Sequence, residues 1–186
     1  LVQRGTRALS AKEHNDALDM LGIKRQVSCG IEFFRISGVM LSSRLAQGIP
    51  LLSRYLLQPA LPEKDLVACK SLVLQSIQSL SDNPAHLASV ALNSHHLPCP
   101  FNRSAYGNAS AVESATINRL RSVYRKLFSP VHSILVVAGD VDHEEVLKVI
   151  TKTTESWGEA EGNTPAEGEP NRGIHWIQQD TSQVHL

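Results

Sequence analysis

The sequence predicts an α+β fold, because helix start signals and strand-like runs both occur along its 186 residues. Two capping boxes, Ser10 with Glu13 and Asp142 with Glu145, mark the starts of helices. The segment Gln26–Val39 is rich in β-branched and aromatic residues with a period of two, which predicts a strand. The chain is therefore expected to alternate strands with capped helices.

Capping signals and apolar spacing predict a series of helices. The first begins after Ser10 and ends at Gly22, since glycine is typical of a left-handed C-terminal cap. His14, in the first turn of this helix, is expected at the surface, and so is His143 near the end of the chain. The remaining helices are expected within Ser43–Leu57 with a bent or late start, from Pro62 to about Leu80, from Asn83 through His95, after Thr116, and from Asp142 to about Trp157.

Two short segments carry further structural signals. Ser133–Ala138 is a fully apolar run followed by Gly139-Asp140, and this pattern predicts a buried strand. Residues 1–4 have the character of the last turn of an earlier helix, without a cap or a turn before them. We therefore expect the chain to start inside a longer protein.

A change of composition after Trp157 predicts the domain organisation. Residues 158–173 hold four Gly, two Pro and four Glu, and such a segment cannot bury enough apolar surface to fold alone. Ile174–Gln178 and Gln183–Leu186 then have the pattern of strands. We expect one domain over 1–157, a linker over 158–173, and the first strands of a following unit over 174–186.

Charge and composition exclude several classes of function. Lys plus Arg and Asp plus Glu both total 18, so no net field attracts nucleic acid or an anionic membrane. No apolar run approaches the roughly 20 residues that a membrane helix needs. Cys29, Cys69 and Cys99 form an odd set without paired spacing, which is typical of reduced thiols. We predict neither a nucleic-acid partner nor a membrane span.

The sequence holds few patterns of a self-contained catalytic site. It has no P-loop, no dinucleotide-binding glycine motif, no nucleophile elbow and no HExxH motif. His95-His96 with Cys99 is the only cluster of metal-binding side-chain types, but Pro98 separates these groups, and zinc needs a third or fourth ligand in fixed geometry. A polar helix terminus is the interpretation that this pattern favours.

The predicted helix from Pro62 has an uncharged face. Cys69 and Ser76 are seven residues apart and share that face, and no acidic residue occurs from Val67 to Ser81. A helix that presented a carboxylate to a metal would place Asp or Glu among these positions. The residues alone favour a packed helix with small residues where a neighbour comes close.

Motifs along nearly the whole chain share one order. They are Arg4-Gly5-Thr6, Leu57-Gln58-Pro59, Asp82-Asn83-Pro84, the loop before Gly107, Phe128-Ser129-Pro130, and Leu135-Val-Val-Ala-Gly-Asp-Val-Asp142. In this order they resemble the M16 zinc metallopeptidases, the family of insulinase, pitrilysin and mitochondrial processing peptidase. The resemblance implies helices packed on one face of a mostly antiparallel sheet, in a half-domain that is incomplete at its N-terminus.

The same resemblance implies where a zinc site would lie. In the family an HxxEH motif supplies two zinc-binding His and a Glu general base, and a Glu on a later helix supplies the third protein ligand. The register of Gly5-Thr6 puts the second His immediately before Leu1, the later Glu at Ser76 and a supporting acid at Cys69. A serine hydroxyl is a poor substitute for a carboxylate toward zinc. We therefore assign no catalytic, cofactor-binding or metal-binding residue within 1–186, and expect zinc only in a parent protein that carries HxxEH.

Two functions stay open at this stage. The parent protein is either a catalytically silent M16-like member or subunit that pairs with another M16-like half-domain, or an active zinc endopeptidase that takes peptides or unfolded proteins as substrates. Ser76 and Cys69 favour the first, and the retained Arg4-Gly5-Thr6 motif favours the second. A binding module of unrelated chemistry is a third possibility, for which the sequence offers no site. Residues 1–186 alone are predicted to bind no zinc and to cleave no peptide.

Overall fold

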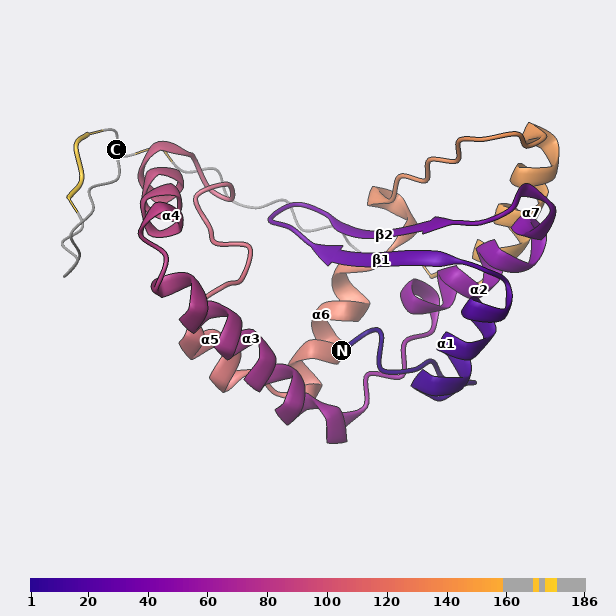
Figure 1. The fold of residues 1–186 in the computed structure, drawn as a ribbon, viewed down its shortest axis with the longest axis horizontal. Coiled ribbons are helices and arrows are strands. Elements are labelled where there is room, and N and C mark those ends of the chain that lie inside the picture. The colour runs from indigo at the N-terminus through magenta and orange to yellow at the C-terminus, as the bar shows by residue number, and fades with distance from the viewer. Residues whose placement is uncertain (159–168, 171–172, 177–186) are drawn as a thin grey trace. The chain divides into compact units, whose positions relative to one another are not determined.

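The structure is a computed structural model that describes residues 1–158, 169–170 and 173–176. It divides into two compact units (Figure 1). The described part of unit 1 comprises Leu1–Ser28, Arg35–Leu66 and residues 116–158, and that of unit 2 comprises Cys29–Phe34, Val67–Ala115 and the described residues after 168. The architecture is α+β, as the sequence predicts.

The helices begin at the residues whose side chains cap them. The elements in chain order are α1 Ala11–Met20, β1 Lys24–Cys29, β2 Phe34–Val39, the 3₁₀ turn η1 Ser42–Arg44, α2 Leu45–Leu57, η2 Glu63–Asp65, α3 Leu66–Ser81, α4 Pro84–His96, α5 Ala109–Ser114, α6 Ile117–Leu127, η3 Pro130–His132 and α7 His143–Thr154. Ser10 and Glu13 form both hydrogen bonds of the predicted capping box, and Asp142 caps α7. Asn83 caps α4 and Thr116 caps α6, which confirms those predicted starts.

The prediction of one continuous strand over Gln26–Val39 is wrong, because the segment contains two strands. The structure forms an antiparallel hairpin, in which β1 and β2 are separated by a turn closed by Gly30 N–H donating to Phe33 O at 2.9 Å. Ile31 and Phe33 would share one face of a continuous strand with a period of two, but in the structure they lie exposed in this turn. The β-rich composition continues through the turn, so periodicity alone did not separate the two strands.

Residues 1–4 form a single turn closed by Arg4 N–H donating to Leu1 O. Two further sequence expectations differ from the structure. The helix expected from Pro62 starts as the 3₁₀ turn η2, with Pro62 just before it, and becomes α-helical at Leu66. Helix α5, capped by Asn108, lies within a region where no helix was predicted.

The predicted buried strand Ser133–Ala138 is also wrong for the structure of residues 1–158. Residues 134–138 are extended but pair with no other described strand, and all are exposed. An apolar run forms a buried strand only where a neighbouring strand and a covering layer are present, and sequence pattern alone does not supply them. The predicted linker and the strands after it fall mostly outside the described residues, and the described residues 174–176 carry no strand.

The core of unit 1 lies between α1, α2 and the hairpin. Leu18, Ile23 and Tyr55 are fully or almost fully buried there. Val27 of β1 and Ile36 of β2 pack against this cluster, so both helices cover one face of the hairpin. Helix α2 also packs against α7, which places it at the centre of unit 1. Gly48 in α2 permits this close packing, because a Cβ there would collide with the Met40 side chain.

His14 is buried in this core, which corrects the expectation of a surface residue. Its Nε2 lies 2.9 Å from the Leu51 carbonyl, and its ring packs edge-on to Tyr55 with centroids 4.5 Å apart. An imidazole that donates from Nε2 is neutral with Nδ1 as an acceptor, and Nδ1 is buried without a hydrogen-bond partner. Desolvation lowers the pKa of His14, and the charges of Arg54 and Arg25 lower it further, against the Leu51 hydrogen bond. His14 and Leu18 are four residues apart on α1, so i,i+4 spacing was the available signal.

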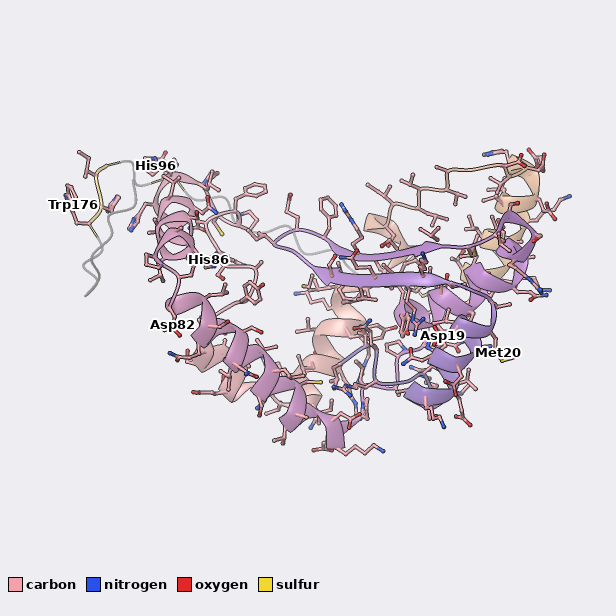
Figure 2. All side chains as sticks on the ribbon, in the orientation of Figure 1. Asp19, Met20, Asp82, His86, His96 and Trp176 are labelled. Atoms are coloured by element: carbon pink, nitrogen blue, oxygen red, sulfur yellow. The ribbon has the colours of Figure 1, made fainter. Side chains whose placement is uncertain are left out.

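Leu18→Ala should lower the free energy of unfolding of unit 1 by about 3 kcal/mol, because the substitution leaves a cavity in a fully buried cluster. Met20→Ala is the matched control on the same helix, since Met20 is 87% exposed and lies away from the core (Figure 2). Urea denaturation of both variants measures the difference. Equal effects of the two substitutions would contradict the assigned core.

Acidification should destabilise unit 1 through His14. Because the folded pKa of His14 lies below its unfolded value of about 6.5, the unfolded state binds more protons as the pH falls below that value. Stability is therefore complete above pH ~6.5 and decreases as the pH falls toward the folded pKa. Urea denaturation across this range should show a weaker pH dependence for His14→Gln than for wild type. The exposed His143→Gln variant is the control, and a decrease in slope of the same size there would contradict the assignment.

Candidate functional site

Two motifs that are far apart in the sequence meet in unit 1. Thr6 and Pro59 form an antiparallel bridge. On either side of it, Arg7 N–H donates to Gln58 O at 2.9 Å and Ala60 N–H donates to Gly5 O at 3.1 Å. We call residues 5–7 with 58–60 the Gly5–Pro59 junction. It joins the segment before α1 to the segment after α2.

Glycine is required at the junction by its backbone geometry. Gly5 has φ +105°, and a Cβ there would lie 3.0 Å from Ala11 N and 3.1 Å from Leu9 O. Thr6 is buried, and its Oγ1 accepts the Leu9 N–H at 3.0 Å while its own N–H donates to Leu9 O at 2.8 Å. The Gly-Thr pair therefore shapes the turn that leads into α1.

Side chains of helix α6 bind the segment that connects α2 to η2. Tyr124 donates its hydroxyl to the Leu56 carbonyl at 2.7 Å, and Arg121 Nη2 donates to the Leu61 carbonyl at 3.2 Å. Leu56 is in the last turn of α2, where carbonyl groups lack a partner within the helix. Burial raises the pKa of Tyr124, which favours its protonated, donating form. These two side chains hold the connection between α2 and η2.

The positions that the resemblance gives to zinc-site carboxylates lie on α3. Ser76 and Cys69 are both partly buried there. The Ser76 hydroxyl donates to the Leu72 carbonyl of its own helix at 2.9 Å, so its proton is used within α3. The described structure places no carboxylate on this part of the helix, since Leu66–Ser81 contains none.

The cluster at the end of α4 does not form a metal site among the described residues. His95 stacks on His175 with ring centroids 3.5 Å apart, and Arg103 donates to Cys99 Sγ at 3.4 Å. No group of three or more His, Cys, Asp or Glu in the described part of the chain could hold a metal ion. The stacked pair follows from packing within unit 2 and supplies no complete ligand set.

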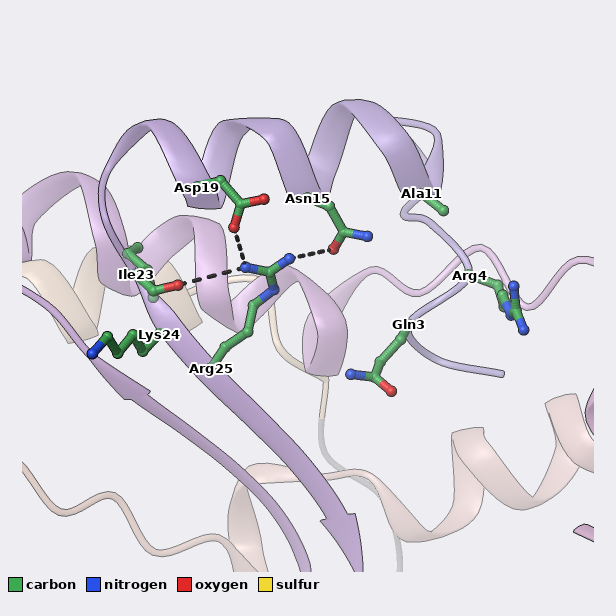
Figure 3. Close-up of a pocket in the computed structure, with 8 residues that line it drawn as sticks. All are labelled: Gln3, Arg4, Ala11, Asn15, Asp19, Ile23, Lys24 and Arg25. Carbon is green, nitrogen blue, oxygen red and sulfur yellow. Dashed lines mark hydrogen bonds and ion pairs between the residues drawn. The ribbon is translucent and has the colours of Figure 1, made fainter. Parts of the chain in front are cut away.

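An open pocket of about 690 Å³ lies along α1 and the start of β1 (Figure 3). Arg25 forms part of the pocket wall. Its Nη1 donates a hydrogen bond to Asp19 Oδ1 at 2.6 Å, and its Nη2 donates to Asn15 Oδ1 at 3.0 Å. Tyr55 also donates to Asn15 Oδ1, at 2.9 Å. The Asp19 hydrogen bond raises the pKa of Arg25, so this cation stays charged. The full lining is Gln3, Arg4, Ala11, Asn15, Asp19, Ile23, Lys24 and Arg25, which includes no nucleophile paired with a base.

Comparison with known proteins gives one consistent result. The family model described as "Peptidase M16 inactive domain" matches residues 114–186. An uncharacterized zinc protease of Streptomyces coelicolor is 24% identical over all of this chain and 43% of its own length. The crystal structure of a protease from Helicobacter pylori superposes with a TM-score of 0.80 at 19% identity, over 91% of this chain and 42% of that one. An M16 inactive domain from Pseudomonas fluorescens gives a TM-score of 0.80 at 16% identity, over 89% and 42%.

The chain is an M16 peptidase-like protein. It spans less than half the length of the curated relatives it matches. Among its described residues no helix combines the length and the hydropathy needed to cross a bilayer.

Zinc does not fit the residues that this M16 peptidase-like chain offers. On α3, Cys69 is the single side chain of a zinc-binding type between Leu66 and Ser81, and Ser76 is the residue that the resemblance would give to a ligand carboxylate. The described residues hold no second group close enough to complete a ligand set. No catalytic step through zinc is therefore derived from this chain.

Sequence reasoning missed the residues that organise the M16 peptidase-like domain around α2. Arg121, Tyr124 and His14 all act on backbone carbonyls of α2 or of the segment after it. In the sequence, Tyr124 fits the apolar face of the helix expected after Thr116, and this spacing alone gives its hydroxyl no partner. Its hydroxyl and the i,i+3 spacing from Arg121 were the available signals, but the carbonyl acceptors of Arg121 and Tyr124 lie 60 and 68 residues away in the sequence.

Gly5→Ala should lower the free energy of unfolding by about 2–3 kcal/mol, because the left-handed φ and the contacts with Ala11 N and Leu9 O both oppose a Cβ. Gly22→Ala is the matched control, since Gly22 has φ +67° with open space around it and should lose only about 1 kcal/mol. Thermal and urea denaturation of both variants measure the difference. A Gly5→Ala protein as stable as the Gly22→Ala protein would contradict the junction geometry.

Proposed function

We propose that the protein containing this chain is a catalytically silent M16-like member or subunit. The observation that carries the proposal is Ser76, which stands at the position of a zinc-ligand Glu in the resemblance and donates its hydroxyl to Leu72 within α3. Cys69 departs from the pattern on the same helix. Two such departures on one helix leave the third protein ligand and its supporting acid unsupplied.

A silent M16-like chain acts through its shape. We propose that residues 1–157 form an M16-like half-domain, joined through the linker 158–173 to a following half-domain, and that the two half-domains enclose a chamber for peptides or unfolded proteins. The proposal is supported by the match to an M16 inactive domain and by a coverage of less than half of the matched chains. Pairing with a second M16-like subunit would build the same chamber in trans.

An active zinc-dependent metalloendopeptidase is the second candidate. The retained Arg4-Gly5-Thr6 motif of the resemblance keeps this candidate open, and Gly5 and Thr6 are buried at the Gly5–Pro59 junction. The Streptomyces coelicolor relative also carries the name of a zinc protease. This activity requires an HxxEH motif in the parent protein and a third ligand other than Ser76.

Zinc content and peptide cleavage of the full-length protein separate the two functions. We expect zinc well below one ion per molecule and no turnover of quenched-fluorescent peptides, because α3 offers no carboxylate. Stoichiometric zinc together with turnover in the unmutated protein would contradict the silent assignment.

Ser76→Glu tests the position itself. If an upstream HxxEH motif is present, this variant should bind zinc at least ~10-fold more tightly than wild type, because a carboxylate ligand is restored. Ser79→Glu is the matched control on the exposed side of the same helix. Metal analysis after dialysis against limiting zinc gives the measurement. An equal gain in both variants would show nonspecific binding and contradict the role given to position 76.

A further inference from the structure

Helix α6 of unit 1 carries a concentration of positive charge. Its 11 residues include no Asp or Glu but four cations, Arg119, Arg121, Arg125 and Lys126. The sequence around the helix holds no acidic residue from Ser114 to Gly139, although the chain as a whole is neutral. Helix α7, in contrast, combines two Glu with two Lys. Surface helices are stabilised by pairs of opposite charge three or four residues apart, and α6 cannot form such pairs within itself.

The charge of Arg119 opposes the local stability of α6. Thr116 caps the helix by accepting the Arg119 N–H at 3.3 Å, so Arg119 is the third helical residue. At this position a Glu side chain would complete a capping box and would interact favourably with the positive end of the helix dipole. Glu13 in α1 and Glu145 in α7 stand at the corresponding position of their helices. The stability of α6 therefore does not explain a cation at residue 119.

The exposed side of α6 combines cations with apolar side chains. Arg119 and Lys126 are exposed and seven residues apart, so they lie on one face about 10 Å apart along the helix axis. Val123 is four residues after Arg119, and Leu127 is four residues after Val123, which places both on the same side of the helix. Their side chains are 42% and 48% exposed. We call Arg119, Val123, Lys126 and Leu127 the α6 strip.

The two cations of the α6 strip have no acidic partner in the described part of the chain. Neither Arg119 nor Lys126 forms an ion pair with any carboxylate there. The two carboxylates of η2 follow directly after the segment that α6 binds, yet they form no ion pair with the helix either. On its other side α6 is held by the hydrogen bonds of Tyr124 and Arg121 to the connection between α2 and η2. The strip is therefore a surface of fixed spacing with unpaired charge.

The spacing of the α6 strip fits an acidic amphipathic helix. Carboxylates seven residues apart on such a helix match the separation of Arg119 and Lys126, and apolar residues between the carboxylates would contact Val123 and Leu127. A single-stranded nucleic acid is bound by cations together with aromatic side chains, and the strip contains no aromatic residue. An anionic membrane attracts clusters of four to eight cations, whereas the strip holds two. Charge and apolar pattern together therefore favour a protein partner.

We propose that the α6 strip is a docking site for an acidic amphipathic helix of a partner protein. Arg119 and Lys126 bind carboxylates of that helix, and Val123 and Leu127 contact its apolar residues. Complementary charge gives this contact its specificity, which accounts for a cation at a position where helix stability favours Glu. The docking goes beyond the chamber proposed above, and it holds for a silent chain as well as for an active one.

Binding of a labelled helical peptide to the full-length protein tests the docking site. The probe is a peptide of about 20 residues with Glu at every seventh position and Leu at the third and fourth positions after each Glu. In fluorescence anisotropy at low salt, the double variant Arg119→Gln/Lys126→Gln should bind this peptide at least ~10-fold more weakly than wild type. The matched control Lys148→Gln/Lys152→Gln removes the same charge from α7 and should change the affinity less than ~2-fold.

Three results of this experiment would overturn the proposal. The first is no binding of the Glu peptide to wild type at concentrations up to ~1 mM. The second is equal affinity for the Glu peptide and for a peptide with Gln in place of Glu, or equal effects of the two double variants. The third is tighter binding of duplex DNA, or of vesicles of phosphatidylserine and phosphatidylcholine, than of the peptide, with the same dependence on Arg119 and Lys126, since the strip would then serve another class of ligand.

Charge reversal separates docking from folding. Arg119→Glu completes the capping box with Thr116, so this variant should have a Tm ~1–3 °C above that of wild type while it binds the Glu peptide more weakly. The double variant Arg119→Glu/Lys126→Glu should prefer a peptide with Lys in place of Glu by at least ~10-fold. A lower Tm for Arg119→Glu, or a double variant without preference for the Lys peptide, would overturn the proposal. Neither measurement depends on whether the protein cleaves peptides.

Discussion

The packing of α1 against α2 through a neutral, buried imidazole holds unit 1 together. His14 connects its ring to Tyr55 and its Nε2 to the Leu51 carbonyl, inside a cluster completed by Leu18 and Ile23. The Arg25 network continues from Tyr55 through Asn15 to Asp19 on the outer side of the same cluster. Since Nδ1 of His14 has no partner, this contact stays favourable only while the ring is neutral.

Around that cluster, α2 is the element on which the other parts of unit 1 converge. Its C-terminal carbonyl at Leu56 receives Tyr124, and the segment that follows forms the Gly5–Pro59 junction. Two motifs of the family resemblance are therefore in direct contact. The turn formed by Gly5 and Thr6 pairs through its backbone with the segment from Gln58 to Ala60. Their retention is accounted for by folding, and it is compatible with a silent chain as well as with an active one.

Unit 2 differs from unit 1 in its degree of burial. Among the residues of unit 2 whose burial is described, none is buried. Large apolar side chains on α3 and α4 are exposed, namely Val67, Leu72 and Leu92. A helical unit without a core of its own gains too little from apolar burial to offset the loss of chain entropy. Among the described residues of unit 2, the helix with Ser76 and Cys69 is therefore not stabilised by a buried apolar core.

Local chemistry in the sequence determined the helix starts and the α+β class. Ser10, Asn83, Thr116 and Asp142 cap helices through bonds to residues three positions away, so each signal is complete within one turn. Only the tertiary structure decided that Gln26–Val39 folds back as a hairpin, that His14 is buried, and that Tyr124 and Arg121 hold the end of α2. These outcomes depend on partners tens of residues away. For the same reason the apolar run at Ile134–Ala138 has the pattern of a strand in the sequence, whereas in the structure it pairs with no described strand.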